Sequence, residues 1–187
     1  MDFVTGTSKS LAKGLYNNLA HYRYRVFVET LGWQMDTPVG VERDQFDRED
    51  TVYVVSRDYN NNINGCARLL PTTAPYLLAE IFPQLLHGLP VPSDPDTWEL
   101  SRFAAIDFND KNTSPLHQCS SPIAVELLRQ SIACARKLGA KRLITVSPVG
   151  IERLLRRAGF NAKRAGPPII VDGHALFACL IDVNENT

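Results

Sequence analysis

Hydrophobic residues recur at helical spacing near the start of the chain. Five of them lie three or four positions apart, as on one face of a helix: Leu11, Leu15, Leu19, Tyr22 and Val26. We therefore predict an amphipathic helix over about residues 10–30 that stops near Gly32. The acidic segment 34–50 lacks this periodicity, so we predict an ordered loop there.

The pattern after residue 50 predicts short strands that later alternate with helices. We expect Ser120 or Ser121 to cap a helix whose first residue is Pro122. Hairpins followed by alternating strands and helices favour an α/β fold, a three-layer sandwich with a mixed sheet. The predicted elements are, in order, strands 51–57 and 63–70 as a hairpin, a short helix over 79–86, a strand over 97–105, a helix over 122–139, a strand over 143–147, a helix over 148–158, and strands near 168–172 and 174–182.

Length and composition indicate one domain over residues 1–187. Hydrophobic residues make up 44% and charged residues 21% of the chain, which is ordinary for a globular protein and argues against disorder. No apolar run reaches the length of a membrane span, and residues 1–14 lack the features of a signal peptide. Four scattered cysteines suggest neither a metal site nor a redox motif. We expect a cytoplasmic protein.

The net charge is zero, but the charges are unevenly distributed. Residues 1–114 carry 10 Lys and Arg against 15 Asp and Glu, whereas residues 115–175 carry 10 against 3. A basic C-terminal part suggests an acidic partner. A solvated helix face explains the same charges, and nucleic acid is a third possibility that no recognisable binding module supports.

Several motifs follow one another between residues 20 and 105. They are Arg23-x-x-x-Phe27, Leu31-Gly32-Trp33, Asp44-Gln45-Phe46-Asp47, Thr51-x-Tyr53, the run from Gly65 to Thr73, Tyr76-Leu77-Leu78, and Glu99-Leu100-Ser101-Arg102-Phe103. In these motifs the chain resembles the acyl-homoserine-lactone synthases of the autoinducer synthase family. The residues that match the family's signature in order and spacing are Arg23, Phe27, Trp33, Asp44, Asp47, Arg68, Glu99 and Arg102.

The resemblance implies an enzyme that makes a quorum-sensing signal. Such a synthase transfers an acyl chain from an acyl carrier protein to the amine of S-adenosylmethionine (SAM), and then closes a lactone and releases 5′-methylthioadenosine. Acyl-CoA remains open as the donor. The resemblance implies no cofactor, since SAM is a substrate, and no metal. It also implies no nucleic-acid partner and no stable membrane insertion. The segment 154–160 additionally resembles the C-terminal part of GNAT acyltransferases, which suggests a GNAT-like fold.

The reaction needs a base, because the α-amino group of SAM has an ordinary pKa of about 8 and must lose a proton before it attacks. Glu99 is our candidate, and a structural salt bridge to an arginine is the alternative. Strand alternation puts Glu99 and Ser101 on one face and Arg102 on the other. If Glu99 and Arg102 both face one cleft, a bulge or a strand end must redirect one of them.

The other signature residues suggest a SAM pocket. Asp44, Asp47, Arg68 and Arg102 look like the family's network of opposed charges. Asp47 could meet the amine or sulfonium, and Arg23 or Arg102 the carboxylate. Alternatively, these pairs only hold the loop. The remaining candidates are the aromatic residues Phe27, Trp33 and Phe103. Of these, Trp33 is the better ligand candidate, through cation–π attraction, and Phe27 alone is typical of a core.

Two further groups follow from the resemblance. Thr145 stands where family members that make 3-oxo or 3-hydroxy signals tend to carry threonine. Other walls of an acyl tunnel, which are equally typical of an ordinary core, are Phe82, Val146, Leu154, Leu155 and Phe177. The expected docking residues for the carrier protein are Lys141, Arg142, Arg153, Arg156 and Arg157.

Two alternatives differ in class. The first is a GNAT-type N-acetyltransferase that uses acetyl-CoA, but residues 103–122 contain no glycine, which argues against the usual pyrophosphate loop of that class. The second is a regulator that binds nucleic acid through its basic helix. That hypothesis leaves the acidic loop and Glu99 without a role.

Overall fold

The computed structural model describes residues 1–110 and 121–183, apart from the side chains of Arg153 and Arg157. The chain divides into two compact units. Unit 1 contains residues 1–68 and 102–130, and unit 2 contains residues 69–101 and those from 131 onward. Strands β3 and β4 and helix α3 contribute residues to both units. Among the described residues, no helix combines the length and the apolar character that crossing a membrane requires.

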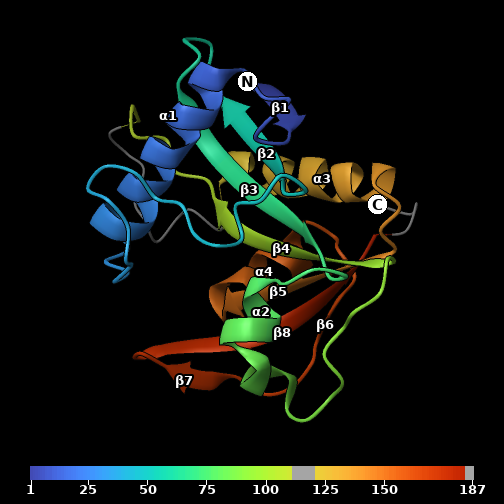
Figure 1. Cartoon of the computed structure of the whole chain (residues 1–187). Helices are drawn as coiled ribbons and strands as arrows, with labels where there is room; N and C mark the ends of the chain where they lie inside the picture. Colours follow the sequence, from blue (N-terminus) through green and yellow to red (C-terminus); the bar gives the residue numbers. More distant parts are fainter. Residues whose placement is uncertain (111–120, 184–187) are drawn as a thin grey trace. The chain divides into compact units, whose positions relative to one another are not determined.

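Unit 1 is built from one edge of a sheet and a long N-terminal helix (Figure 1). Its strands follow the order β1-β2-β3-β4, and β1 runs antiparallel to β2. The predicted hairpin of β2 and β3 is confirmed, whereas β1 was not predicted because five residues are too short to show a clear alternation. The elements are β1 (Asp2–Gly6), α1 (Lys13–Arg23), the π-helix η1 (Tyr24–Thr30), β2 (Val52–Arg57), β3 (Ile63–Pro71) and β4 (Thr97–Ala104).

The first helix changes its hydrogen-bond register halfway. The predicted helix over residues 10–30 is present, but its second half is π-helical. The Leu31 N–H donates to the carbonyl of Val26, five residues earlier, at 2.9 Å. The helix ends at Thr30, close to the predicted stop near Gly32, which has φ +70°. The loop over residues 34–50 contains neither helix nor strand, also as predicted.

Helices cover both faces of the sheet in unit 1. Leu19 and Tyr22 of α1 pack in one core with Cys66 of β3. The neighbouring Gly65 points to the opposite face, where a Cβ atom would lie 3.3 Å from Leu127 of α3 (Pro122–Lys137). The order helix, sheet, helix confirms the predicted sandwich in this unit. Helix α3 begins with a cap, since the Ala124 N–H donates to Ser121 Oγ at 3.1 Å; Ser120 lies outside the described residues.

Unit 2 continues the sheet in the order β3-β4-β5-β8-β6, with β7 paired to β8. Strand β4 runs parallel to β5, and β8 runs antiparallel to β5, so the sheet is mixed as predicted. The turn between β7 and β8 has positive φ at Asp172 and Gly173, which suits a tight hairpin. The further elements are α2 (Leu77–Ile81), the 3₁₀ helix η2 (Pro83–Leu86), β5 (Arg142–Pro148), α4 (Gly150–Arg157), β6 (Ala162–Arg164), which was not predicted, β7 (Ile169–Val171) and β8 (His174–Asp182).

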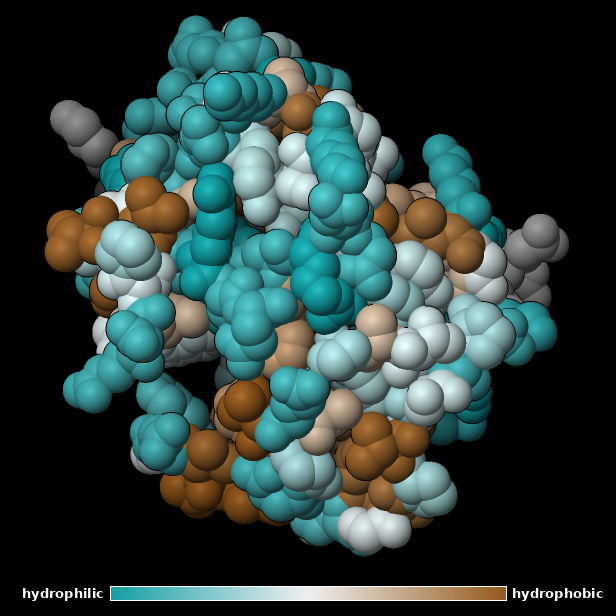
Figure 2. Space-filling view, viewed as in Figure 1, coloured by the Kyte–Doolittle hydropathy of each residue, from teal (hydrophilic) through white to brown (hydrophobic). Residues whose placement is uncertain are grey.

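The surface carries its exposed apolar side chains in separate patches. On the face shown in Figure 2, the brown patches are divided from one another by hydrophilic side chains. The larger exposed apolar residues of unit 2 include Ile81, Leu89 and Ile170, of which Ile170 is 69% exposed. Scattered exposure of this kind is ordinary for a globular protein.

Candidate functional site

A cluster of buried charges forms the main polar feature of unit 1. Three arginines come from regular elements, at the end of α1, in β3 and in β4, and three acids come from the loop over residues 34–50. The six residues are Arg23, Glu42, Asp44, Asp47, Arg68 and Arg102. Arg23, Arg68 and Glu42 are almost fully buried. Burial of so many ionised groups requires that each is paired.

The six residues form a closed ring in which arginines and acids alternate. The carboxylate of Asp47 pairs with Arg23 at 2.7 Å and with Arg68 at 3.3 Å. The carboxylate of Asp44 pairs with Arg68 at 2.6 Å and with Arg102 at 2.7 Å. The carboxylate of Glu42 pairs with Arg102 at 3.1 Å and also with the Nε of Arg23, and this last pair closes the ring. We call this arrangement the charge ring. Each acid bridges two arginines, so the six formal charges cancel.

Hydrogen bonds from the loop and from β2 complete the charge ring. Asp44 Oδ1 accepts from the Phe46 N–H at 2.9 Å, and Asp47 Oδ2 accepts from the Asp44 N–H at 2.8 Å. The Tyr53 hydroxyl donates to Asp47 Oδ1 at 2.8 Å. No role was predicted for Tyr53, although it lies in a signature motif, and Glu42 was not among the predicted site residues. Glu42 stands two residues before Asp44 in the same acidic loop, which was the available signal.

Electrostatics keeps the pair of Asp47 and Arg23 in the charge ring ionised. Burial raises the pKa of the Asp47 carboxyl, but Arg23 and Arg68 lower this pKa by more, so that it lies well below the ordinary value. Burial alone would lower the pKa of Arg23, but Asp47 and Glu42 raise it well above the usual value. The pair is therefore charged over the whole range in which the protein is expected to work.

Arg102 has an unusual backbone conformation. Its φ is +49°, in the left-handed region that residues with a side chain rarely adopt. Strand alternation is broken here, and the guanidinium of Arg102 reaches Glu42 and Asp44. We expected such a redirection at Arg102 or Glu99 if both were to face one cleft. The structure places the distortion at Arg102.

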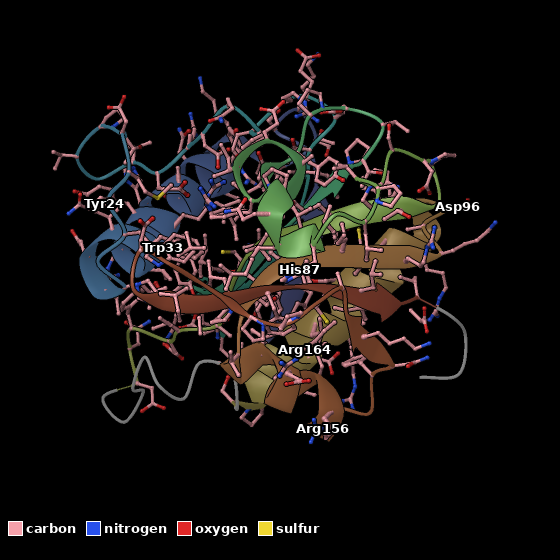
Figure 3. All side chains as sticks on the ribbon, turned by 90° about the horizontal axis from the view of Figure 1, so that it is seen from below. Tyr24, Trp33, His87, Asp96, Arg156 and Arg164 are labelled. Carbon is pink, nitrogen blue, oxygen red and sulfur yellow. The ribbon has the colours of Figure 1, made fainter. Side chains whose placement is uncertain are left out.

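Two aromatic rings lie beside the charge ring. Phe27 of η1 is buried, and Trp33 stacks on it with ring centroids 4.8 Å apart and an interplanar angle of 29°. The guanidinium carbon of Arg102 lies 5.5 Å from the Phe27 centroid and 5.8 Å from the Trp33 centroid. Trp33 is 39% exposed, so part of its ring is open to a ligand (Figure 3). Phe103, the neighbour of Arg102, is half-buried.

Glu99 belongs to unit 2 and is fully buried in β4. Its Oε1 accepts from the Leu78 N–H at 2.7 Å, and its Oε2 accepts from the Leu77 N–H at 3.1 Å. Both donors are in the first turn of α2, where backbone N–H groups lack helical partners. The predicted alternatives for Glu99 were a base and a salt bridge to an arginine, and this anchoring of a helix was not predicted. Leu77 and Leu78 stand in a quoted motif, but nothing local connects them to Glu99.

The predicted acyl walls divide between the two faces of the sheet in unit 2. On β5 and β8, Thr145 is paired with Cys179 and Ser147 with Phe177, so the side chains of Thr145 and Phe177 share one face. Val146 points to the opposite face. Thr145 and Phe177 can therefore line one side of the sheet together, and Val146 cannot join them there. The Thr145 hydroxyl lies 3.2 Å from Ser147 Oγ. Of the other predicted walls, Leu154 and Leu155 are buried in α4, and Phe82 is half-buried.

The expected docking residues of unit 2 are well exposed where the structure describes them. Arg156 is 80% and Lys141 70% exposed, and Arg142 is 51% exposed. Figure 3 shows Arg156 at the periphery of the molecule. Lys141 pairs with Asp96 at 2.7 Å. The side chains of Arg153 and Arg157 lie outside the described part of the chain.

Comparisons with known proteins agree with one another. The profile of a family described as autoinducer synthase matches residues 8–187. An acyl-homoserine-lactone synthase of Acinetobacter nosocomialis is 56% identical over 183 residues, which span 98% of this chain and 100% of that protein. The crystal structure of TofI in a ternary complex with an inhibitor and MTA has a TM-score of 0.84 at 44% identity and covers 98% of this chain and 92% of TofI.

A more distant likeness concerns the fold alone. Escherichia coli ElaA, a GNAT-like neighbour in structure, has a TM-score of 0.64 at 12% identity. It covers 96% of this chain and 97% of ElaA. This confirms the predicted GNAT-like α/β fold class.

Removal of one acid from the charge ring tests its contribution to stability. We expect Asp47→Asn to lower the free energy of unfolding at pH 7 by about 3 to 5 kcal/mol, because Arg23 and Arg68 lose a buried partner. The folded-state pKa of Asp47 is depressed, so its contribution is complete above its ordinary pKa of about 3.9 and is lost as the pH falls below it. The difference in the free energy of unfolding between Asp47→Asn and wild type should therefore shrink as the pH falls below the ordinary pKa of Asp. Urea unfolding at several pH values measures both effects.

The matched control is Asp36→Asn, which removes the same charge from an exposed position of the same loop. It should change the free energy of unfolding by less than about 0.5 kcal/mol. Equal stability of the two variants at pH 7 would contradict a stabilising charge ring.

Proposed function

Because the chain belongs to the autoinducer synthase family, we propose that it acylates the amine of SAM from an acyl carrier protein and then closes a homoserine lactone. The chain is an acyl-homoserine-lactone synthase, an acyltransferase of quorum sensing. The observation that carries this conclusion is 56% identity to such a synthase along essentially the whole of both chains. The acyl donor, the SAM substrate and the leaving group belong to the proposal.

The proposed reaction has two steps. The SAM amine first loses a proton and attacks the acyl thioester; an amide bond forms, the C–S bond of the thioester breaks, and the carrier thiol leaves. The carboxylate oxygen of the acylated product then attacks its own γ-carbon. The bond from that carbon to the sulfonium breaks, and 5′-methylthioadenosine (MTA) leaves. The MTA named in the TofI complex, at 44% identity, supports this leaving group. The second step is intramolecular, so orientation of the bound chain accelerates it.

In unit 1, the Trp33 ring and the charge ring suit the charged end of SAM. The exposed part of the Trp33 ring offers a π face to the sulfonium or to adenine. Among the acids of the ring, Asp44 has the most exposed side chain at 12%, against 3% for Asp47. We therefore assign the contact with the SAM amine to Asp44 rather than to Asp47. Arg102 lies beside both aromatic rings and is our candidate for the SAM carboxylate.

Glu99 is the proposed general base. Its two carboxylate oxygens offer about four lone-pair positions, of which Leu77 and Leu78 occupy two. These two hydrogen bonds hold the carboxylate in a fixed orientation, and a carboxylate is a group that can accept the proton of the amine. No cofactor takes part in this scheme, and the proton transfer needs no metal.

In unit 2, the face shared by Thr145 and Phe177 suits the acyl chain. The Thr145 hydroxyl, which lies 3.2 Å from Ser147 Oγ, can donate a hydrogen bond to an oxygen at acyl C3, which favours a 3-oxo or 3-hydroxy signal. The proposed partners are an acyl carrier protein and SAM, without nucleic acid. Because both are found in the cytoplasm, we propose that the enzyme acts there.

Identification of the product tests the function as a whole. We expect the purified protein, given SAM and acyl carrier protein loaded with medium-length acyl chains, to release acyl-homoserine lactone and MTA in equal amounts. Mass spectrometry identifies both products and the favoured acyl chain. The same assay with acyl-CoA separates the two donor classes. Absence of lactone with either donor would refute the proposed reaction.

Replacement of the proposed base tests its role. We expect Glu99→Gln to keep SAM binding, because the Gln carbonyl still accepts from one of the two N–H groups, and to slow acylation by roughly 10²- to 10⁴-fold. Stopped-flow measurement of amide formation gives the rate, and calorimetry gives SAM binding. Glu80→Gln changes an exposed residue of α2 and should leave both unchanged. Full activity of Glu99→Gln would remove Glu99 from the mechanism.

Charge reversal tests the docking of the carrier protein. We expect Lys141→Glu with Arg156→Glu to raise KM for the acyl carrier protein by about tenfold or more at low salt, and to leave KM for SAM within twofold. The control reverses Lys9 and Lys13, two exposed cations of unit 1. Equal effects on both substrates, or equal effects of both double variants, would argue against this docking surface.

A further inference from the structure

Helix α2 is capped from a neighbouring strand rather than by the residue that precedes it. Ser, Thr, Asp and Asn usually cap a helix, because their short side chains accept from the first N–H groups. The residue before α2 is Tyr76, whose hydroxyl instead donates to the carbonyl of Pro92. Glu99 of β4 accepts from the N–H groups of Leu77 and Leu78 in its place. The orientation of the Glu99 carboxylate therefore depends on where the first turn of α2 is held.

The hydrogen bond from Tyr76 to Pro92 holds this turn. Tyr76 is 2% exposed, and its hydroxyl lies 2.7 Å from the Pro92 carbonyl oxygen. Burial raises the pKa of the Tyr76 hydroxyl above its ordinary value of about 10, and the negative charges of Glu99 and Asp94 raise it further. The hydroxyl therefore keeps its proton and remains a donor over the whole range in which the protein is expected to work.

Thr72 makes a second tie to the same part of the chain. Its hydroxyl lies 2.8 Å from the carbonyl oxygen of Thr97 and 2.9 Å from that of Asp94. It also accepts from the Asp94 N–H at 3.2 Å. Thr97 is the first residue of β4 and stands two positions before Glu99. Thr72 thus joins the end of β3 to the start of the strand that carries the proposed base.

The segment over residues 92–97, to which both side chains are tied, is itself well fixed. Two of its six residues are proline, which restricts the backbone. The carbonyl of Asp96 accepts from the Lys141 N–H at 2.7 Å and from the Arg142 N–H at 3.0 Å, at the start of β5. A segment anchored in this way can hold the start of α2 in place.

We propose that Thr72 and Tyr76, through their hydrogen bonds to residues 92–97, form a clamp that positions the general base Glu99. The clamp fixes the first turn of α2, and the two N–H groups of that turn fix the carboxylate. Thr72 and Tyr76 lie in signature motifs, and no role was predicted for them. They are positioning residues, since they act through α2. The inference rests on the proposed acyl transfer. Loss of a clamp hydroxyl loosens the carboxylate, so proton transfer from the SAM amine slows while SAM binding is unchanged.

A double-mutant cycle with Glu99 tests the clamp. Tyr76→Phe removes the hydroxyl and keeps the ring. We expect the single-turnover rate of acylation to fall by about two- to tenfold, which corresponds to one hydrogen bond, and Kd for SAM to stay within twofold. In the Glu99→Gln background the same change should have no further effect, because the base through which the clamp acts is absent. Slowing by the same factor in both backgrounds would indicate a merely structural role and overturn the proposal.

Matched variants separate the clamp from general damage. Thr72→Val removes a hydroxyl from a side chain of the same shape and should slow acylation to a similar degree, whereas Thr72→Ser keeps the hydroxyl and should retain the wild-type rate. Tyr59→Phe removes the hydroxyl of a tyrosine that is 94% exposed and should change nothing. Wild-type rates in both Tyr76→Phe and Thr72→Val would contradict the clamp.

Hydrogen exchange of the Leu77 and Leu78 amides provides a readout that does not depend on activity. NMR should show about two- to tenfold faster exchange in Tyr76→Phe and Thr72→Val, because the first turn of α2 opens more readily, and the wild-type rate in Tyr59→Phe. A wild type that makes no lactone would refute the proposed function, while faster exchange in the two variants would still demonstrate the clamp. Unchanged exchange in both would refute the clamp whatever the wild-type activity.

Discussion

The alternation of three arginines with three acids is the interaction on which unit 1 depends. Isolated buried charges would cost far more free energy than the fold can supply. Here every acid bridges two arginines, so each charge has two partners of opposite sign. Loss of any member leaves two buried charges short of a partner. The ring also fixes a loop of irregular backbone, whose acids it takes as members, against α1, β3 and β4.

The charge ring and the helix register together determine what unit 1 can offer to a ligand. The π-helical turn after Arg23 places Phe27 beneath Trp33, and the Trp33 N–H donates to the Phe27 carbonyl at 2.9 Å. The left-handed conformation of Arg102 turns its guanidinium to the ring acids and toward both aromatic rings. The strained backbone of Arg102 thus lies where an arginine, the ring acids and two aromatic rings come together. This combination of groups suits the binding of a sulfonium amino acid.

Unit 2 uses a buried acid in a different way. Glu99 holds the first turn of α2 through two backbone N–H groups. The residue proposed as the base therefore also fixes the start of α2, while His87, just after η2, lies 2.8 Å from the Pro167 carbonyl through its Nε2.

The sequence by itself determined the elements and the family. Helical periodicity, strand alternation and turn residues act over a few neighbouring positions, so most helices and strands were predicted, and eight signature residues in order indicated the activity. The tertiary structure decided the partners: Glu42 in the charge ring, the anchoring of α2 by Glu99, the opposite faces of Thr145 and Val146, and the contact of His87 with Pro167. These contacts join residues that lie 19 to 80 positions apart or depend on sheet register. The local sequence pattern does not predict such long-range contacts, because they form only when the elements of the chain pack together.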